Sequence, residues 1–182
     1  MAQLNSLIEV SSGYTFRGRL PTSMGTGDKR MILPSDLDGL NERQIKGSDL
    51  NAPTVQLVVD DVLLSNRGKF RAALISAPDD YVIPASIFIL RPRSNSIHMP
   101  FLVAFLNSRA GQVALARFVQ GSNIPAITKS ELEGLPIPDL PLATQRQIAT
   151  IAEQLASYRR MTDDKIRATE ELISQLMKAE NE

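Results

Sequence analysis

Residues 144–179 read TQRQIATIAEQLASYRRMTDDKIRATEELISQLMKA, and this stretch decides the fold. No glycine or proline interrupts it, and Thr144 with Gln147 three residues later fits the capping box that begins a helix. At about 1.5 Å per residue, such a helix would span roughly 54 Å. This length exceeds the size of a small domain, so we expect the helix to project beyond its own globule.

Apolar or small side chains recur along this helix at the spacing of a heptad seam. From Ile151 the steps are 4, 3, 4, 7, 3 and 4, and Lys165 fills the position that the step of 7 passes over. Ile166 and Ile173 lie beside the seam and widen it. Since an isolated helix would leave this stripe in water, the pattern predicts pairing with another helix. The alternative is that the stripe folds back on its own front domain. The predicted seam comprises Ile148, Ile151, Leu155, Tyr158, Thr162, Lys165, Thr169, Leu172 and Leu176.

The segment before the helix marks a boundary. Pro136, Pro138 and Pro141 cannot lie within a helix and suit a stiff, extended connector. We therefore predict a globular domain over residues 1–142 and a spacer helix over residues 143–182.

The front domain is predicted to combine strands and helices, which gives an α+β fold. Residues 1–100 carry short apolar runs separated by turn signals, including acid pairs at 60–61 and 79–80 and a mobile loop at 22–29. The predicted strands are Val55–Val59, Val62–Leu64, Phe70–Ser76 and Ser86–Leu90.

Helical spacing replaces this pattern at Met99–Gln120, with a break expected at Ser108–Gly111. Thr128 and Glu131 then form a second capping-box pattern, whose helix must be short because Gly134 and Pro136 follow.

Composition excludes several classes of protein. The 182 residues contain no cysteine, which excludes disulfides and cysteine-ligated metals. No apolar run is long enough to span a membrane and no signal peptide is evident, so we expect a cytoplasmic protein. The net charge is zero, but residues 1–130 hold 14 Lys and Arg against 10 Asp and Glu, whereas the remainder holds 6 against 10. The front domain is thus mildly basic.

No catalytic constellation emerges. His98 is the only histidine, and it stands alone as a structural residue. The acid pairs lie at predicted turns, where aspartate suits the backbone. One alternative remains open, a small nuclease that uses Asp60 or Asp61 with Lys69 and magnesium.

The junction of the domain and the helix resembles the specificity subunits of type I restriction–modification enzymes. The resemblance is carried by GSNIP at 121–125, then Lys129 and Leu132, then LPIPDLPL at 135–142 and QRQI at 145–148. Asp139-Leu140 before Pro141 departs slightly from the family pattern. Further similar segments occur in family order: Gly13–Arg17, Ile32–Leu37, Asp61–Gly68, where Asp60 replaces a glycine, and Phe101–Gly111.

This resemblance implies a subunit that recognises DNA sequence and has no activity of its own. Full-length members have two recognition domains and two long helices, whereas this chain has one of each, which implies a half-subunit that homodimerises antiparallel on double-stranded DNA. The partners implied are methyltransferase and restriction subunits, and S-adenosylmethionine, ATP and Mg²⁺ would be bound by those partners. The alternative from a different class is a coiled-coil adaptor that binds only protein.

A DNA-reading domain needs cations for phosphates and polar side chains for base edges. Arginine pairs efficiently with guanine, and asparagine with adenine. The candidates lie in predicted polar turns and loops: Arg17, Arg19, Lys29, Arg30, Arg43, Lys46, Arg67, Lys69, Arg71, Ser122 and Asn123.

Overall fold

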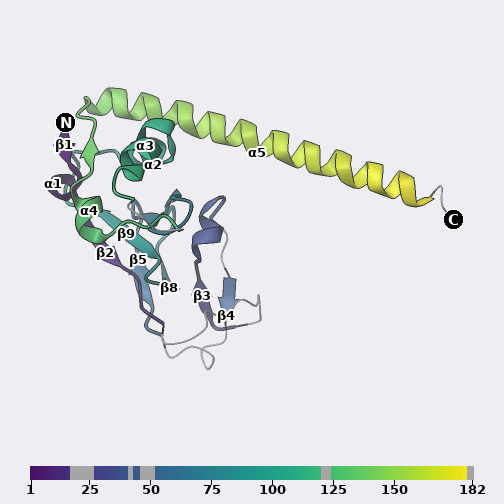
Figure 1. The fold of residues 1–182 in the computed structure, drawn as a ribbon, viewed down its shortest axis with the longest axis horizontal. Coiled ribbons are helices and arrows are strands. Elements are labelled where there is room, and N and C mark those ends of the chain that lie inside the picture. The colour runs from purple at the N-terminus through teal and green to yellow at the C-terminus, as the bar shows by residue number, and fades with distance from the viewer. Residues whose placement is uncertain (17–26, 41–42, 46–51, 120–123, 180–182) are drawn as a thin grey trace.

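The computed structural model describes residues 1–16, 27–40, 43–45, 52–119 and 124–179. It has mixed helix and sheet, with a β-rich globular domain followed by one long C-terminal helix, as the sequence predicts (Figure 1). The predicted mobile loop at 22–29 lies largely outside the described residues.

A four-stranded antiparallel sheet forms the middle layer of the domain, in the order β2-β9-β6-β7. Its strands are β2 Ile8–Ser12, β6 Val62–Ser65, β7 Ala72–Leu74 and β9 Ile87–Pro92. Every residue of β6 is buried. Its side chains do not alternate between apolar and polar because both faces of this sheet are covered.

A second four-stranded sheet, in the order β4-β3-β8-β5, covers one face of the first. β3 and β8 are parallel, whereas β3–β4 and β5–β8 are antiparallel. Leu63 and Ile89 of the middle sheet join Leu57, Tyr81 and Ile83 in one buried cluster between the layers. The strands are β3 Lys29–Met31, β4 Arg43–Ile45, β5 Val55–Leu57 and β8 Asp79–Val82. The short 3-10 helix η1, Pro34–Leu37, follows β3.

Helices cover the other face of the middle sheet. Val62, Leu64 and Leu90 point into a cluster that contains Phe101, Leu102 and other helical side chains. The helices are α1 Leu4–Leu7, α2 Met99–Asn107, α3 Arg109–Ala116 and α4 Lys129–Glu133. Ser108 separates α2 from α3 and caps α3 through the amide of Gly111, within the predicted break.

The proline-rich connector is extended, as predicted, and it pairs with the start of the chain. β10 Pro136–Ile137 runs antiparallel to β1 Ala2–Gln3, and the Leu4 amide donates to the Leu135 carbonyl at 2.9 Å. The capping box of Thr128 and Glu131 at the start of α4 is also confirmed.

The long helix α5 spans Leu142–Ala179, 38 residues, and lies across α2 before projecting away from the domain (Figure 1). Its first turns are anchored: Gln145 and Ala149 are buried, and Ile148 packs against the core. Every described side chain from Glu153 to Lys178 is exposed, so the helix does not fold back on its own domain. None of the described helices is long and apolar enough to cross a membrane.

Two local predictions are wrong. α5 begins at Leu142, so Thr144 lies inside the helix and is not its N-cap. Asp79 and Asp80 lie in β8 rather than in a turn, because they pair with Leu57 and Gln56 of β5. The runs before and after Asp60 are strands joined by a turn, as predicted, and the two strands, β5 and β6, belong to different sheets. Asp60 has a positive φ of 71°, which turns the chain from one layer to the other.

Candidate nucleic-acid interface

A tight loop between β6 and β7 presents Arg67 and Lys69. The buried Ser65 hydroxyl closes this loop by donating to the Lys69 carbonyl at 2.5 Å and accepting from the Arg71 amide at 2.7 Å. Gly68 at its tip has φ +75°, a conformation that side chains rarely adopt. The loop is therefore held in one shape by its own residues.

The loop is also tied to a second segment, Ile124–Ile127. The Gly68 amide donates to Pro125 at 2.7 Å, and the Ile127 amide donates to Asn66 at 2.9 Å. Arg67 and Ala126 form an isolated antiparallel bridge. The structure thus places the loop beside the residues that directly follow Ser122 and Asn123, which themselves lie outside the described residues.

Arg67 and Lys69 are both exposed, as is Arg30. Neither side chain has an ion-pair or hydrogen-bond partner among the described residues, and a cation on a fixed loop suits a phosphate. We name the surface formed by Arg67, Gly68, Lys69 and Ile124–Ala126 the 67/125 edge.

Three other predicted cations have partners within the domain. Arg30 forms an ion pair with Asp79, the Arg71 Nε donates to Asp38 at 2.6 Å, and the Lys29 Nζ donates to the Ala52 carbonyl at 3.1 Å. A phosphate would have to compete with these partners. Arg43 lies in β4, but its side chain is not described. Arg17, Arg19 and Lys46 lie outside the described residues.

An ion pair within the middle sheet, between Arg91 of β9 and the buried Asp61 just before β6, was not predicted. Asp61 has 0 % side-chain exposure, and Arg91 donates from Nε to its Oδ1 at 2.8 Å and from Nη2 to its Oδ2 at 2.6 Å. The Val58 amide donates to Oδ2 at 2.9 Å. The hydrogen bonds to Asp61 raise the pKa of Arg91 above its usual value. No local pattern links residues 61 and 91, because they meet only where β6 pairs with β9.

This ion pair bears on the nuclease alternative. The Asp61 carboxylate is fully buried and accepts three hydrogen bonds, so a magnesium ion would have to compete with these donors. Among the described residues, no three acidic or histidine side chains gather where they could hold a metal ion.

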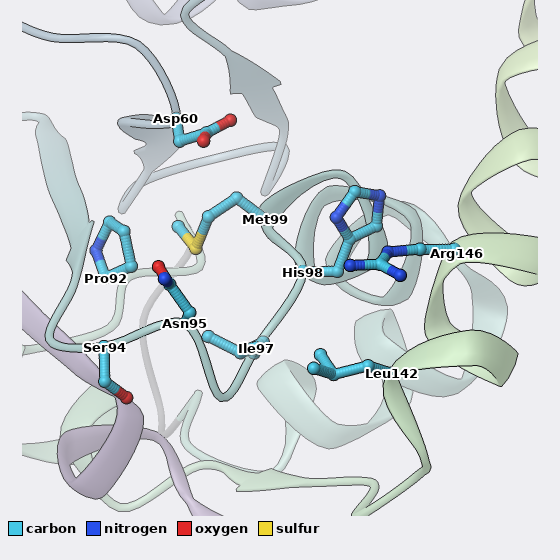
Figure 2. A pocket seen from close by; sticks show the side chains of 9 residues that line it. All are labelled: Asp60, Pro92, Ser94, Asn95, Ile97, His98, Met99, Leu142 and Arg146. Atoms are coloured by element: carbon cyan, nitrogen blue, oxygen red, sulfur yellow. The ribbon is translucent and has the colours of Figure 1, made fainter.

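A small pocket of about 170 Å³ lies where α5 meets the β9–α2 connection (Figure 2). Asp60, His98 and Arg146 lie on its wall among short polar and apolar side chains. Beside it, buried Gln145 accepts from the His98 amide at 2.9 Å and donates to the Leu140 carbonyl at 2.8 Å. Gln145 therefore fixes the start of α5 to α2.

The predicted seam residues divide into two groups. Ile148 is half-buried against its own domain, so it does not belong to the free part of the seam. The free seam is therefore one position shorter than the predicted seam. Leu155 is 48 % exposed and Tyr158 71 %. The free seam runs along Ile151, Leu155, Tyr158, Thr162, Lys165, Thr169, Leu172 and Leu176, all of them exposed.

Comparison with known proteins decides the family. A family model described as the type I restriction modification DNA specificity domain matches residues 1–169. The chain belongs to this family. The match covers the globular domain and most of α5, so both parts of this specificity domain are included. No protein with a curated description matches the chain.

Solved structures share the fold. A chain from a structural study of complex assembly and conformational transition in the type I R-M system aligns with TM-score 0.65 and 21% identity, covering 96% of this chain and 42% of that one. The HsdS subunit from Thermoanaerobacter tengcongensis aligns with TM-score 0.59 and 22% identity, covering 92% and 39%. The S subunit of the type I restriction–modification system from M. genitalium aligns with TM-score 0.54 and 16% identity, covering 90% and 39%. This specificity domain thus spans about two fifths of the chains it matches.

Proposed function

We propose that this chain is a DNA sequence-recognition subunit of a type I-like restriction–modification complex. The observation that carries the proposal is the family match over residues 1–169, which includes both a cation-bearing domain and a projecting helix. In this proposal the domain reads one half of the target, and the 67/125 edge supplies phosphate contacts. The chain itself is non-catalytic.

The exposed face of α5 supports a dimer as the working form. An apolar stripe that leaves its own domain needs a partner helix, and a second copy provides an identical stripe. Pairing the two helices antiparallel places a recognition domain at each end. Because the pair has two-fold symmetry, its DNA target is bipartite and palindromic.

The proposed partners supply the chemistry. Methyltransferase subunits dock on the faces of α5 that point away from the seam, and a restriction subunit joins through them. S-adenosylmethionine, ATP and Mg²⁺ are bound by these partners and not by this chain.

DNA binding tests the recognition role. The chain is mixed with its methyltransferase partner and titrated with random-sequence and target DNA, and Arg67→Ala/Lys69→Ala is compared with the unchanged chain. Removing two phosphate contacts lowers the slope of log affinity against log salt by about 1.8. The matched control, Arg160→Ala/Lys178→Ala, removes the same charge from α5 and leaves the slope unchanged once assembly of the complex has been verified. If the unchanged complex shows no DNA binding at low salt, the recognition role is wrong, and an adaptor that binds only protein replaces it.

Sedimentation tests the dimer. The chain has a mass of 20.0 kDa, so we expect a species of about twice that mass at micromolar concentration. Leu155→Asp puts a charge into the seam and yields the single-chain mass with the domain still folded. Ser157→Asp introduces the same side chain away from the seam and leaves the dimer intact. A single-chain mass for the unchanged protein would refute dimerisation.

A further inference from the structure

We propose that two copies of α5 pair in one particular antiparallel register, centred between Asp163 and Asp164. The inference deepens the proposed dimer and rests on it. It follows from how apolar and polar residues are distributed along the exposed seam.

The free seam is apolar at both ends and polar in the middle. Ile151 and Leu155 lie at the end near the domain, and Leu172 and Leu176 lie at the far end. The middle holds Tyr158 and three polar residues: Thr162, Lys165 and Thr169. Such a pattern is nearly symmetric about its own centre, so it can match an inverted copy of itself.

In an antiparallel pair each a-position side chain packs beside a d position of the other helix. With the centre between residues 163 and 164, the aliphatic residues at the two ends meet one another, and the residues of the middle meet one another. Each of the following contacts occurs twice by symmetry: Ile151 with Leu176, Leu155 with Leu172, Tyr158 with Thr169, and Thr162 with Lys165.

Shifting the pair by one heptad in either direction spoils this match. Moving the centre towards the domain sets Lys165 against Leu155. It also needs Ile148 to pair with Leu172, although Ile148 already packs against its own core. Moving the centre the other way sets Thr162 against Leu172 and leaves Leu155 with only the small side chain of Ala179 opposite it. The proposed register makes four contacts between aliphatic side chains, whereas neither shifted register makes more than two.

Two observations disfavour a parallel pair. It would place Lys165 beside Lys165 of the second copy in one layer, where the like charges repel. It would also bring the second helix alongside the first turns of α5, where α2 and the core already cover the seam face at Ile148. In the antiparallel pair, the second helix meets this region only with its far end.

Charged residues do little to set the register from outside the seam. Of the positions flanking the seam, Gln154, Met161, Ala168 and Gln175 lie on one side and Ala152, Arg159, Ile166 and Ile173 on the other. Arg159 is the one charge among them. Charges at flanking positions usually determine the partner and the orientation of a coiled coil. In this helix we infer that the polar residues in the middle of the seam determine them instead.

The register fixes the distance between the two domains. Ala149, buried at the anchored end of α5, lies about 14 residues from the centre. The two anchors are then roughly 44 Å apart along the pair at ~1.5 Å per residue. This distance corresponds to about 13 base pairs of B-DNA at ~3.4 Å each. A shift of one heptad would change it by about 10 Å.

Cysteine cross-linking of the full chain tests the register, because the natural sequence has no cysteine. Chains carrying Leu155→Cys and Leu172→Cys, one of them lengthened by a tag, are mixed and mildly oxidised. We expect a disulfide-linked species of mixed composition on non-reducing gels. Neither variant oxidised alone should link to itself, since the two copies of each cysteine lie far apart. A mixture of Thr162→Cys with Leu172→Cys should link at least tenfold less.

The outcomes separate the register from the dimer. Self-linking of Leu155→Cys would overturn the proposal in favour of a parallel pair, and strong linking of Thr162→Cys with Leu172→Cys would overturn it in favour of the shifted register. In either case a dimer mass by sedimentation leaves the proposed function standing. A single-chain mass, by contrast, refutes the dimer and the register together.

Discussion

Removing the Arg91 side chain tests how much its ion pair with buried Asp61 stabilises the domain. In Arg91→Ala, the carboxylate of Asp61, which has 0 % exposure in the unchanged chain, loses the donors at 2.8 and 2.6 Å. The Val58 amide still donates to Oδ2, whereas Oδ1 has no remaining donor among these contacts. Stranding one partner of a buried pair typically costs about 3–5 kcal/mol.

The loss in free energy of unfolding depends on which partner of the ion pair is left unpaired. Arg91 is 43 % exposed and recovers solvation if Asp61 is removed, but Asp61 has no such recourse. Asp61→Asn should therefore cost less than Arg91→Ala. We expect the free energy of unfolding to fall by about 4 kcal/mol in Arg91→Ala, a large share of the roughly 5–15 kcal/mol typical of domains.

Urea denaturation measures this loss. With a slope of about 2 kcal/mol per molar urea, the unfolding midpoint should fall by about 2 M. Near-ultraviolet circular dichroism reports the transition of the domain through buried Tyr81. Adding Asp61→Asn to Arg91→Ala removes the stranded charge and should restore at least half of the loss. A loss below about 1 kcal/mol, or a double variant no more stable than Arg91→Ala, would refute the reasoning.

Three further predictions concern the scaffold around the site. Gly13→Ala should destabilise the domain by at least about 2 kcal/mol, because the new Cβ would lie 2.3 Å from the Pro84 carbonyl oxygen. In the control Gly134→Ala, the atom nearest to the new Cβ is 3.5 Å away, so the thermal midpoint should change little. Gln145→Leu should cost about 1–3 kcal/mol by removing the two hydrogen bonds that fix α5, with increased amide exchange confined to the first turns of α5 as the readout. Hydrogen bonds from the Thr128 amide, and then from its hydroxyl, lower the pKa of Glu131. The Glu131 carboxylate therefore stabilises the cap above the unfolded pKa near 4.5, and this contribution is lost as the pH falls through the lowered pKa. The difference in unfolding midpoint between Glu131→Gln and the unchanged chain should vanish below that pH.

Local signals predicted the helical parts well. The heptad spacing of α5, the break at Ser108 and the capping box at Thr128 each depend on residues within a few positions of one another. The start of α5 was misplaced by two residues because Thr144 offered a plausible cap. The start of the helix is instead held to the domain by Gln145, whose partner His98 lies far away in sequence.

Local signals failed where distant segments decide the conformation. Asp79 and Asp80 favour a turn, yet they lie in β8 because β5 pairs with them and Arg30 forms an ion pair with Asp79. The short strand β3 has too few residues for a periodic pattern. Among the predicted DNA contacts, Arg67 and Lys69 are cations beside a glycine in a turn. The same local pattern also predicts Arg71 as a contact, although Arg71 donates to Asp38.

The sequence by itself determined that a long, capped, uninterrupted helix with an apolar stripe follows an α+β domain, because helix formation and heptad spacing are set by neighbours a few residues apart. The tertiary structure alone decided which strands share a sheet, that Asp61 is bound by Arg91, and that the seam becomes free after Ile148. These features arise between residues tens of positions apart, and no pattern along the chain records which of them will meet.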